Sequence, residues 1–116
     1  MPTPEFEVTF ARTDEEHRAV QALRYKVFVT ELGGDGPMID HENGLEIDRY
    51  DQHSMYMMLL DRARGGDTSH QLVGAYRLME QSGAQRAGGF YSAQEFDLAA
   101  LMSTPLKLLE LGRSCL

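Results

Sequence analysis

The sequence predicts an α+β fold, in which helices flank a mostly antiparallel sheet, and three observations lead to this prediction. Short segments rich in alternating or β-branched and aromatic residues recur along the chain, as strands require. One longer segment carries apolar residues at three- and four-residue spacing, which is typical of an amphipathic helix. With 116 residues, 42% of them apolar, the chain can bury one modest core, so we expect a single domain over residues 1–116.

The first predicted strand covers Phe6 to Phe10. Apolar and polar residues alternate there, which predicts a half-buried strand. Its inward face is expected to be formed by Phe6, Val8 and Phe10.

The helix that follows is predicted from a capping box. Thr13 stands three residues before Glu16, and acids fill the first turn. The helix should run to about Leu32, because the glycine pair at 33–34 ends it.

One charged residue, Arg24, lies within the apolar stripe of this helix, which comprises Val20, Leu23, Val27 and Phe28. An unpaired buried guanidinium is too costly, so Arg24 either pairs with an acid or holds a functional anion. The alternative is that its aliphatic stem lies along the core while its head reaches solvent. The sequence leaves both open.

The long connection from Gly33 to His53 is acidic, and Arg49 is its only lysine or arginine. Connections of this length in compact domains are usually functional or disordered. Asp48 and Asp51, three residues apart just before a predicted strand, could converge on a cation. We expect no metal site, because the four histidines show no paired spacing and the chain has one cysteine.

Two further strands are predicted at Met55–Asp61 and Gln71–Met79, joined by a polar, Gly-rich, hairpin-like turn. A second capping box, opened by Ser92, predicts a short helix to about Met102. Leu106 to Ser114 predicts a last strand, although its leucines also suit a helix. The predicted element order is β-α-β-β-(α)-β.

The last predicted strand carries Glu110 and Arg113. In a regular extended chain, residues three apart point to opposite faces of the sheet. Ser114 and Cys115 stand beside them, but no nucleophile elbow of the form Gly-x-Ser-x-Gly is present, so a nucleophilic role is not favoured.

Composition excludes several classes of protein. The net charge of −7, without any cluster of lysine or arginine, argues against nucleic-acid binding. A single cysteine excludes an intramolecular disulfide framework and fits a reducing compartment. The sequence shows no secretory signal and no apolar run approaching a membrane helix, so a cytoplasmic protein is expected.

The order of the motifs is more specific than any one of them. Five segments together make the chain similar to the ornithine lipid N-acyltransferases: Leu23–Phe28, Glu31–Pro37, Asp48–Asp51, Val73–Leu78 and Glu110–Cys115. These enzymes are GNAT-like acyltransferases, as are the N-acyl-homoserine lactone synthases. The absence of tryptophan favours the ornithine branch, because the lactone synthases usually carry one shortly after the first helix.

This resemblance implies transfer of a 3-hydroxy fatty acyl group from acyl carrier protein to the α-amine of ornithine, giving lyso-ornithine lipid. It implies Glu110 as the catalytic proton acceptor, acting directly or through a water. The implied substrate-binding residues are Arg24, Phe28, Asp48, Asp51, Arg77 and Arg113. Arg77 could equally be a structural partner of the acids.

The resemblance further implies that no cofactor is tightly bound and that the phosphopantetheine thioester of acyl carrier protein is the acyl donor. Acyl carrier proteins are acidic, so a basic patch is needed to receive one, and the candidates are Arg62, Arg64 and Arg86. The lipid product is compatible with contact at the periphery of the inner membrane.

The chain is expected to form the N-terminal half of the family fold, because no glycine-rich turn and donor-binding helix follow the fourth predicted strand. Two alternatives stay open. One is an N-acyl-homoserine lactone synthase. The other is a non-catalytic half-domain that binds a partner chain or an amine and self-associates, with exposed leucines on its last strand.

Overall fold

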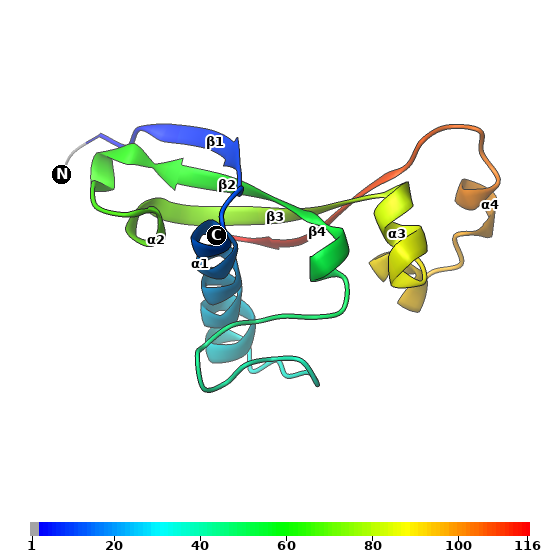
Figure 1. Cartoon of the computed structure of the whole chain (residues 1–116), viewed down its shortest axis with the longest axis horizontal. Coiled ribbons are helices and arrows are strands. Elements are labelled where there is room, and N and C mark those ends of the chain that lie inside the picture. Colours follow the sequence, from blue (N-terminus) through cyan, green and yellow to red (C-terminus); the bar gives the residue numbers. More distant parts are fainter. Residues whose placement is uncertain (1–2) are drawn as a thin grey trace.

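The computed structural model describes residues 3–116 and is built around a four-stranded antiparallel sheet with strand order β1-β2-β3-β4 (Figure 1). The strands are β1 (Phe6–Phe10), β2 (Met55–Asp61), β3 (Leu72–Glu80) and β4 (Leu109–Cys115). Their bounds agree closely with the predicted ones, except that β4 begins at Leu109 rather than Leu106. The predicted α+β class and the order of its strands are confirmed.

A single helical segment follows β1, as the sequence predicts. It begins as α1 (Asp14–Arg24) and continues in a wider, π-helical form as η1 (Tyr25–Glu31). The predicted capping box is present: the Thr13 hydroxyl accepts from the Glu16 N–H at 3.1 Å, and the Glu16 carboxylate accepts from the Thr13 N–H at 3.1 Å. Gly33, with φ of 73°, ends the helix in the left-handed conformation that glycine adopts without strain.

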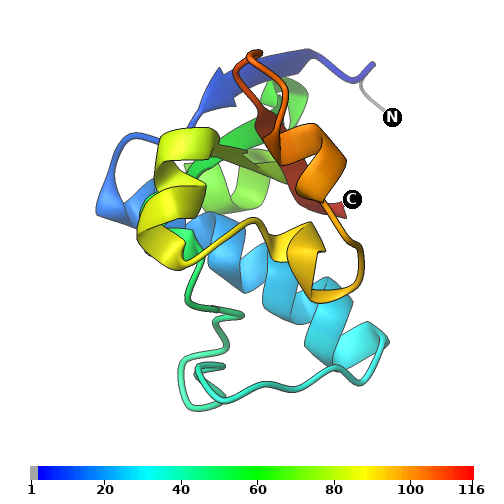
Figure 2. The same ribbon diagram turned by 90° about the vertical axis from the view of Figure 1, so that its right-hand side faces the viewer.

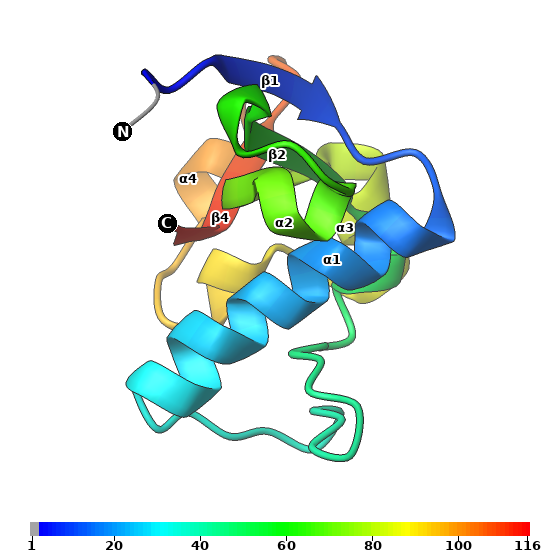
Figure 3. The same cartoon turned by 90° about the vertical axis from the view of Figure 1, so that its left-hand side faces the viewer.

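Helix α1 covers one face of the sheet (Figure 3), and its apolar stripe packs against the strands. Val20 and Met58 are completely buried at this contact. Burying such side chains stabilises a fold by roughly 1.5–3 kcal/mol each. The core on this side consists of Ala19, Val20, Tyr56, Met58, Leu60, Leu72, Ala75 and Cys115.

A second, smaller core lies where three helical segments gather (Figure 2). These segments are α3 (Gln81–Ala87), η4 (Tyr91–Gln94) and α4 (Ala99–Met102). The core residues are Tyr50, Met79, Ala84, Ala87 and Phe90. Tyr50 comes from the long acidic connection, so this core holds that connection against the sheet.

Helix α3 also contacts η2 (Asp51–His53), a 3-10 turn at the end of the connection. A Cβ atom on Gly83 would lie 2.3 Å from the carbonyl oxygen of His53, so glycine is needed for this approach. The contact positions the turn that carries Asp51.

The predicted helix from Ser92 to Met102 is wrong. The backbone N–H of Ser92 donates to Glu110 of β4 at 2.8 Å, and the chain forms the short turn η4 instead. Helix α4 starts separately, where the Asp97 carboxylate accepts from the Ala99 N–H at 3.0 Å. A carboxylate distant in sequence replaces the expected local cap, which a local pattern cannot reveal.

The turn between β2 and β3 differs from the predicted hairpin. It contains a 3-10 turn, η3 (Arg62–Arg64), and one turn of helix, α2 (Thr68–Gln71). Asp61 caps the first by accepting from the Ala63 N–H, and Asp67 caps the second by accepting from the His70 N–H. Aspartate favours such caps.

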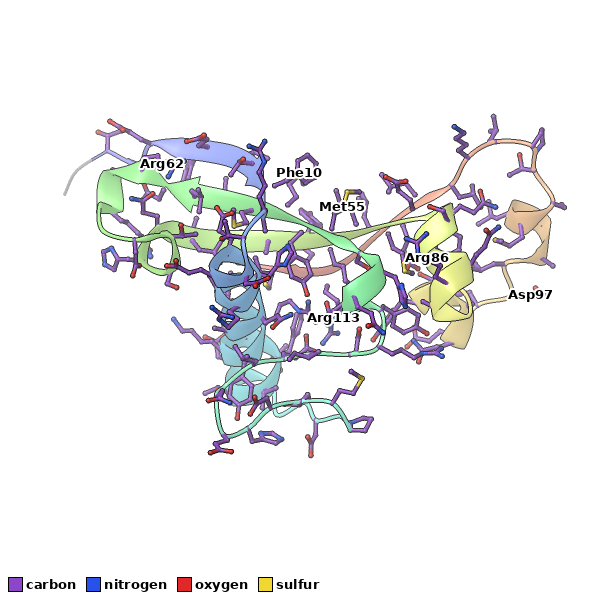
Figure 4. All side chains as sticks on the ribbon, viewed as in Figure 1. Phe10, Met55, Arg62, Arg86, Asp97 and Arg113 are labelled. Carbon is purple, nitrogen blue, oxygen red and sulfur yellow. The ribbon has the colours of Figure 1, made fainter. Side chains whose placement is uncertain are left out.

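The face of the sheet opposite α1 is uncovered, which corrects the prediction for β1. Phe6 and Val8 are 64% and 61% exposed, and Phe10 is also exposed. Figure 4 shows Phe10 and Met55 on this side. The alternation was right, but alternation alone does not say which face is covered. Leu109 and Leu111 of β4 are exposed too, as the half-domain alternative expects.

Among residues 3–116, no helix combines the length and the apolar composition needed to span a bilayer.

Candidate active site

Arg24, the charged residue in the apolar stripe of α1, has no exposed surface. Its Nη1 and Nη2 donate to the two oxygens of Asp51 at 2.6 and 3.1 Å, and its Nε donates to Glu46 at 2.7 Å. Burial by itself lowers the pKa of Arg24, but Asp51 and Glu46 outweigh burial and raise the pKa above its ordinary value. Of the two sequence-based alternatives, pairing with acids is therefore confirmed.

Asp51 is the centre of this network. Besides Arg24, its carboxylate accepts from the Tyr56 hydroxyl at 2.7 Å, the Asp48 N–H at 2.8 Å and Arg77 at 3.2 Å. Burial alone would raise the pKa of Asp51, but the bonds and charge of Arg24, with the other donors, hold the pKa below its ordinary value. Both oxygens are occupied by protein groups.

The lowered pKa of Asp51 predicts acid sensitivity. The carboxylate contributes stability in full above its unfolded pKa of about 4, and loses it as pH falls further toward the folded pKa. The free energy of unfolding, from urea titrations at pH 2 to 7, should therefore fall below about pH 4. Asp51→Asn should make this fall shallower, whereas Glu31→Gln, at an exposed position, should not. An unchanged slope in Asp51→Asn would contradict the assignment.

Arg77 fixes the side chain of Asp48, the other acid of the pair Asp48 and Asp51. This residue of β3 is 4% exposed, and its Nη1 donates to Asp48 at 2.6 Å. Its guanidinium lies 5.6 Å from the ring centre of Tyr50 and 5.3 Å from that of Tyr91. The same Asp48 oxygen accepts from the Tyr50 N–H at 2.9 Å. The Asp48 side chain is nevertheless 26% exposed, so this acid stays accessible.

Arg113 joins the network through an irregularity in β4. The pairing of β3 with β4 shifts by one residue there, and Arg113 has a φ of 47°, as in a β-bulge. The bulge turns Arg113 to the helix-covered side (Figure 4), where it bonds to Glu46 and lies 4.1 Å from the ring centre of Phe28. Glu110 faces the same side, so the expected placement on opposite faces is wrong, because the extra residue breaks the period of two.

A cavity of about 560 Å³ lies above this network, within the range of small-molecule sites. Of the predicted site residues, Phe28, Asp48 and Arg113 line it. The wall of the cavity does not include Arg24, Asp51 or Arg77. These buried residues instead fix the acids of the wall, because Arg24 binds Glu46 as well as Asp51, and Arg77 binds Asp48. The rest of its wall includes Leu32, Met38, Ile39, Glu46, Ile47, Arg49, Tyr50, Tyr91 and Gln94. We call this cavity the acidic-loop pocket.

Glu110, the predicted proton acceptor, lies outside the acidic-loop pocket. Its two oxygens accept from the backbone N–H groups of Tyr91 and Ser92 at 3.0 and 2.8 Å. It borders a smaller, mostly apolar groove with Leu98, Leu101, Met102, Leu108 and Leu109 among its other residues. Glu110 is thus one residue removed from the pocket, because the Tyr91 that it holds is part of the pocket wall.

Sequence reasoning missed three residues of the site. Glu46 joins Arg24 to Arg113, and nothing in its sequence context separates it from the other acids of the connection. Tyr50 stood inside the recognised motif, but its burial at 3% exposure could not be read from one aromatic residue. Tyr91 stood in no recognised pattern.

Other residues considered in the sequence lie away from the pocket. Cys115 is buried, and burial raises the pKa of its thiol, which disfavours nucleophilic use. Arg62 pairs with Glu7 at 2.5 Å and shares the turn η3 with Arg64. Figure 4 shows Arg86 at a separate place in the molecule, so the three expected basic residues do not form one patch. Within residues 3–116, no three His, Cys, Asp or Glu side chains are grouped to hold a metal.

Comparisons with known proteins place these observations in a family. Residues 23–116 match the model of the acetyltransferase (GNAT) domain. The chain is 46% identical over 110 residues to an L-ornithine N(alpha)-acyltransferase of Rhodobacter capsulatus, covering 95% of this chain and 42% of the relative. It is 40% identical to the protein of the same name from Rhizobium meliloti, covering 94% of this chain and 38% of the relative.

The protein of that name from Agrobacterium fabrum is 39% identical, with 94% and 38% coverage. The chain thus spans about two fifths of the length of these relatives. No solved structure matches it. The GNAT match includes every residue that lines the acidic-loop pocket, from Phe28 to Arg113. The chain therefore belongs to the GNAT acetyltransferase domain family.

Proposed function

We propose that the protein is an N-acyltransferase that moves a 3-hydroxy fatty acyl group from acyl carrier protein to the α-amine of ornithine, giving lyso-ornithine lipid. The observation that carries this proposal is the acidic-loop pocket, where Asp48 keeps an accessible carboxylate beside paired charges, aromatic rings and apolar side chains. The names of the similar ornithine acyltransferases support the choice of substrate.

The reaction joins the amine nitrogen to the thioester carbonyl carbon and breaks the carbon–sulfur bond. The phosphopantetheine thiol is the leaving group, and the amine gives up a proton. Because the reference pKa of an α-amine is about 8, it must lose a proton before it attacks. Glu110, acting through a water near Tyr91, is the proposed acceptor.

The paired residues supply rigidity in this proposal. Arg24, Asp51 and Arg77 are buried and hold Asp48 in one orientation, so it can receive a cationic amino group without rearrangement. Phe28 and Arg113 form the adjoining wall. The donor arrives as a carrier-protein thioester rather than as a tightly bound cofactor. A carrier-bound donor and a lipid product place the reaction in the cytoplasm, next to the inner membrane.

The test is mass spectrometry of lipid extracts from cells that make no ornithine lipid and express the gene encoding this chain. Supplied with ornithine, they should accumulate a 3-hydroxyacyl-ornithine that empty-vector cells lack, as cells expressing the Rhodobacter capsulatus relative should. Acyl-homoserine lactone in the medium would instead support the lactone synthase. If the cells contain as much folded protein as cells expressing the relative do, but no acylated ornithine, the ornithine proposal is refuted.

A further inference from the structure

Charge pairing in the acidic-loop pocket leaves one arginine without an acid. Around the pocket, Arg24 pairs with Glu46 and Asp51, Arg77 pairs with the two aspartates, and Arg113 pairs with Glu46. Within residues 3–116, Arg49 has no carboxylate at ion-pair distance, although it lines the same pocket. Its charge is therefore available to a ligand.

Arg49 is also held in place. Its Nη2 donates to the Tyr50 hydroxyl at 2.7 Å, and its guanidinium lies 4.7 Å from the centre of the Tyr50 ring. Tyr50 is itself buried at 3% exposure in the smaller core. Stacking on a fixed aromatic ring limits the freedom of the guanidinium, which lowers the entropic cost of binding a ligand there. The remaining N–H groups of Arg49 face no acceptor among the described residues.

Arg113 is less suited to bind an anion from the pocket. Its guanidinium is neutralised by Glu46 and stacked on Phe28, and its Nε is buried without a partner among the described residues. A ligand carboxylate there would compete with a fixed carboxylate of the protein. Arg49 imposes no such competition.

Asp48, the residue before Arg49, offers a negative charge to the same pocket. Both hydrogen bonds that Asp48 accepts, from Arg77 and from the Tyr50 N–H, go to its Oδ1. Its Oδ2 has no hydrogen-bond donor among residues 3–116, and the side chain is 26% exposed. One accessible carboxylate oxygen and one accessible guanidinium therefore come from adjacent residues in one wall.

We propose that Arg49 binds the carboxylate of an amino acid whose ammonium group pairs with the carboxylate of Asp48. This inference rests on the proposed ornithine substrate. The pair recognises a zwitterion, and planar guanidinium groups bind carboxylates by two parallel hydrogen bonds. The site then selects amino acids over amines that lack a carboxylate. Ornithine and putrescine make this comparison, because putrescine has both amino groups of ornithine and no carboxylate.

The experiment is titration calorimetry of the protein with ornithine and with putrescine, for wild type, Arg49→Gln and Arg86→Gln. Arg86 is an exposed arginine outside the pocket and serves as the matched control. Wild type should bind ornithine about tenfold or more tightly than putrescine, the usual gain from a hydrogen bond to a charged group. Arg49→Gln should abolish most of this preference by weakening ornithine alone, and Arg86→Gln should preserve it.

Any of three results would overturn the role of Arg49. These are equal affinity of wild type for the two ligands, equal weakening of both affinities by Arg49→Gln, and no binding of ornithine. A mixture with acyl-carrier-protein thioester, assayed for acyl transfer, separates this inference from the proposed function. Binding with the predicted preference, but without transfer, would leave the carboxylate site standing and refute the acyltransferase.

Discussion

Arg24→Ala is expected to lower the free energy of unfolding by several kcal/mol. The substitution removes the side chain that makes two hydrogen bonds to Asp51, and it leaves Asp51 and Glu46 buried with one cation fewer. Breaking a buried ion pair by removing one partner costs about 3–5 kcal/mol. That is a large part of the roughly 5–15 kcal/mol by which small domains are stable.

Urea unfolding followed by circular dichroism measures the effect. Arg18→Ala is the matched control, because Arg18 lies on the same helix and is exposed. We expect it to change the free energy of unfolding by less than about 0.5 kcal/mol. Arg24→Lys should also be destabilised, since an ammonium group does not reproduce the two-pronged contact with Asp51. An Arg24→Ala protein with the same free energy of unfolding as wild type would contradict the role of the buried network.

Glu110→Gln is expected to lower kcat for ornithine acylation by about 100- to 10,000-fold, the usual contribution of a general base. Glutamine keeps the size of the side chain but does not accept a proton at neutral pH. It also offers one acceptor oxygen where Glu110 uses two, so one of the Tyr91 and Ser92 N–H groups loses its partner. We expect that loss to cost about 1–3 kcal/mol of stability.

The two roles of Glu110 are separated by measuring both quantities on the same variants. Glu95→Gln, at an exposed position in the same region, is the control and should leave kcat and stability unchanged. If Glu110→Gln loses stability but keeps its kcat, Glu110 only anchors the Tyr91 segment, and another group takes the proton. A large loss of kcat with KM little changed supports proton transfer.

Local patterns predicted the elements whose causes are local. The Thr13 capping box and the strand at Met55–Asp61 were predicted from neighbouring residues alone, and both are confirmed. The helix expected from Ser92 failed because its capping partner is Glu110, 18 residues away. Strand β1 was found, but its covered face was not, since the choice of face depends on where α1 packs.

The residues of the site were likewise predictable from the sequence only where their cause is local. Arg24 was identifiable because a charge inside an apolar stripe demands a partner, yet which acids pair with it depends on the fold. Glu46 was indistinguishable from the other acids of its connection. The position of Arg113 depends on a β-bulge, and one extra residue in a strand reverses the face that a period of two assigns.

Acyl transfer by purified protein, with ornithine and a 3-hydroxyacyl thioester of acyl carrier protein as substrates, tests the proposed activity directly. Fragmentation of the product in the mass spectrometer shows which nitrogen carries the acyl group. We expect acylation at the α-nitrogen, in amounts proportional to the protein added. Folded protein that yields no acyl-ornithine, in a reaction where the Rhodobacter capsulatus relative yields it, would contradict the proposed ornithine N-acyltransferase activity.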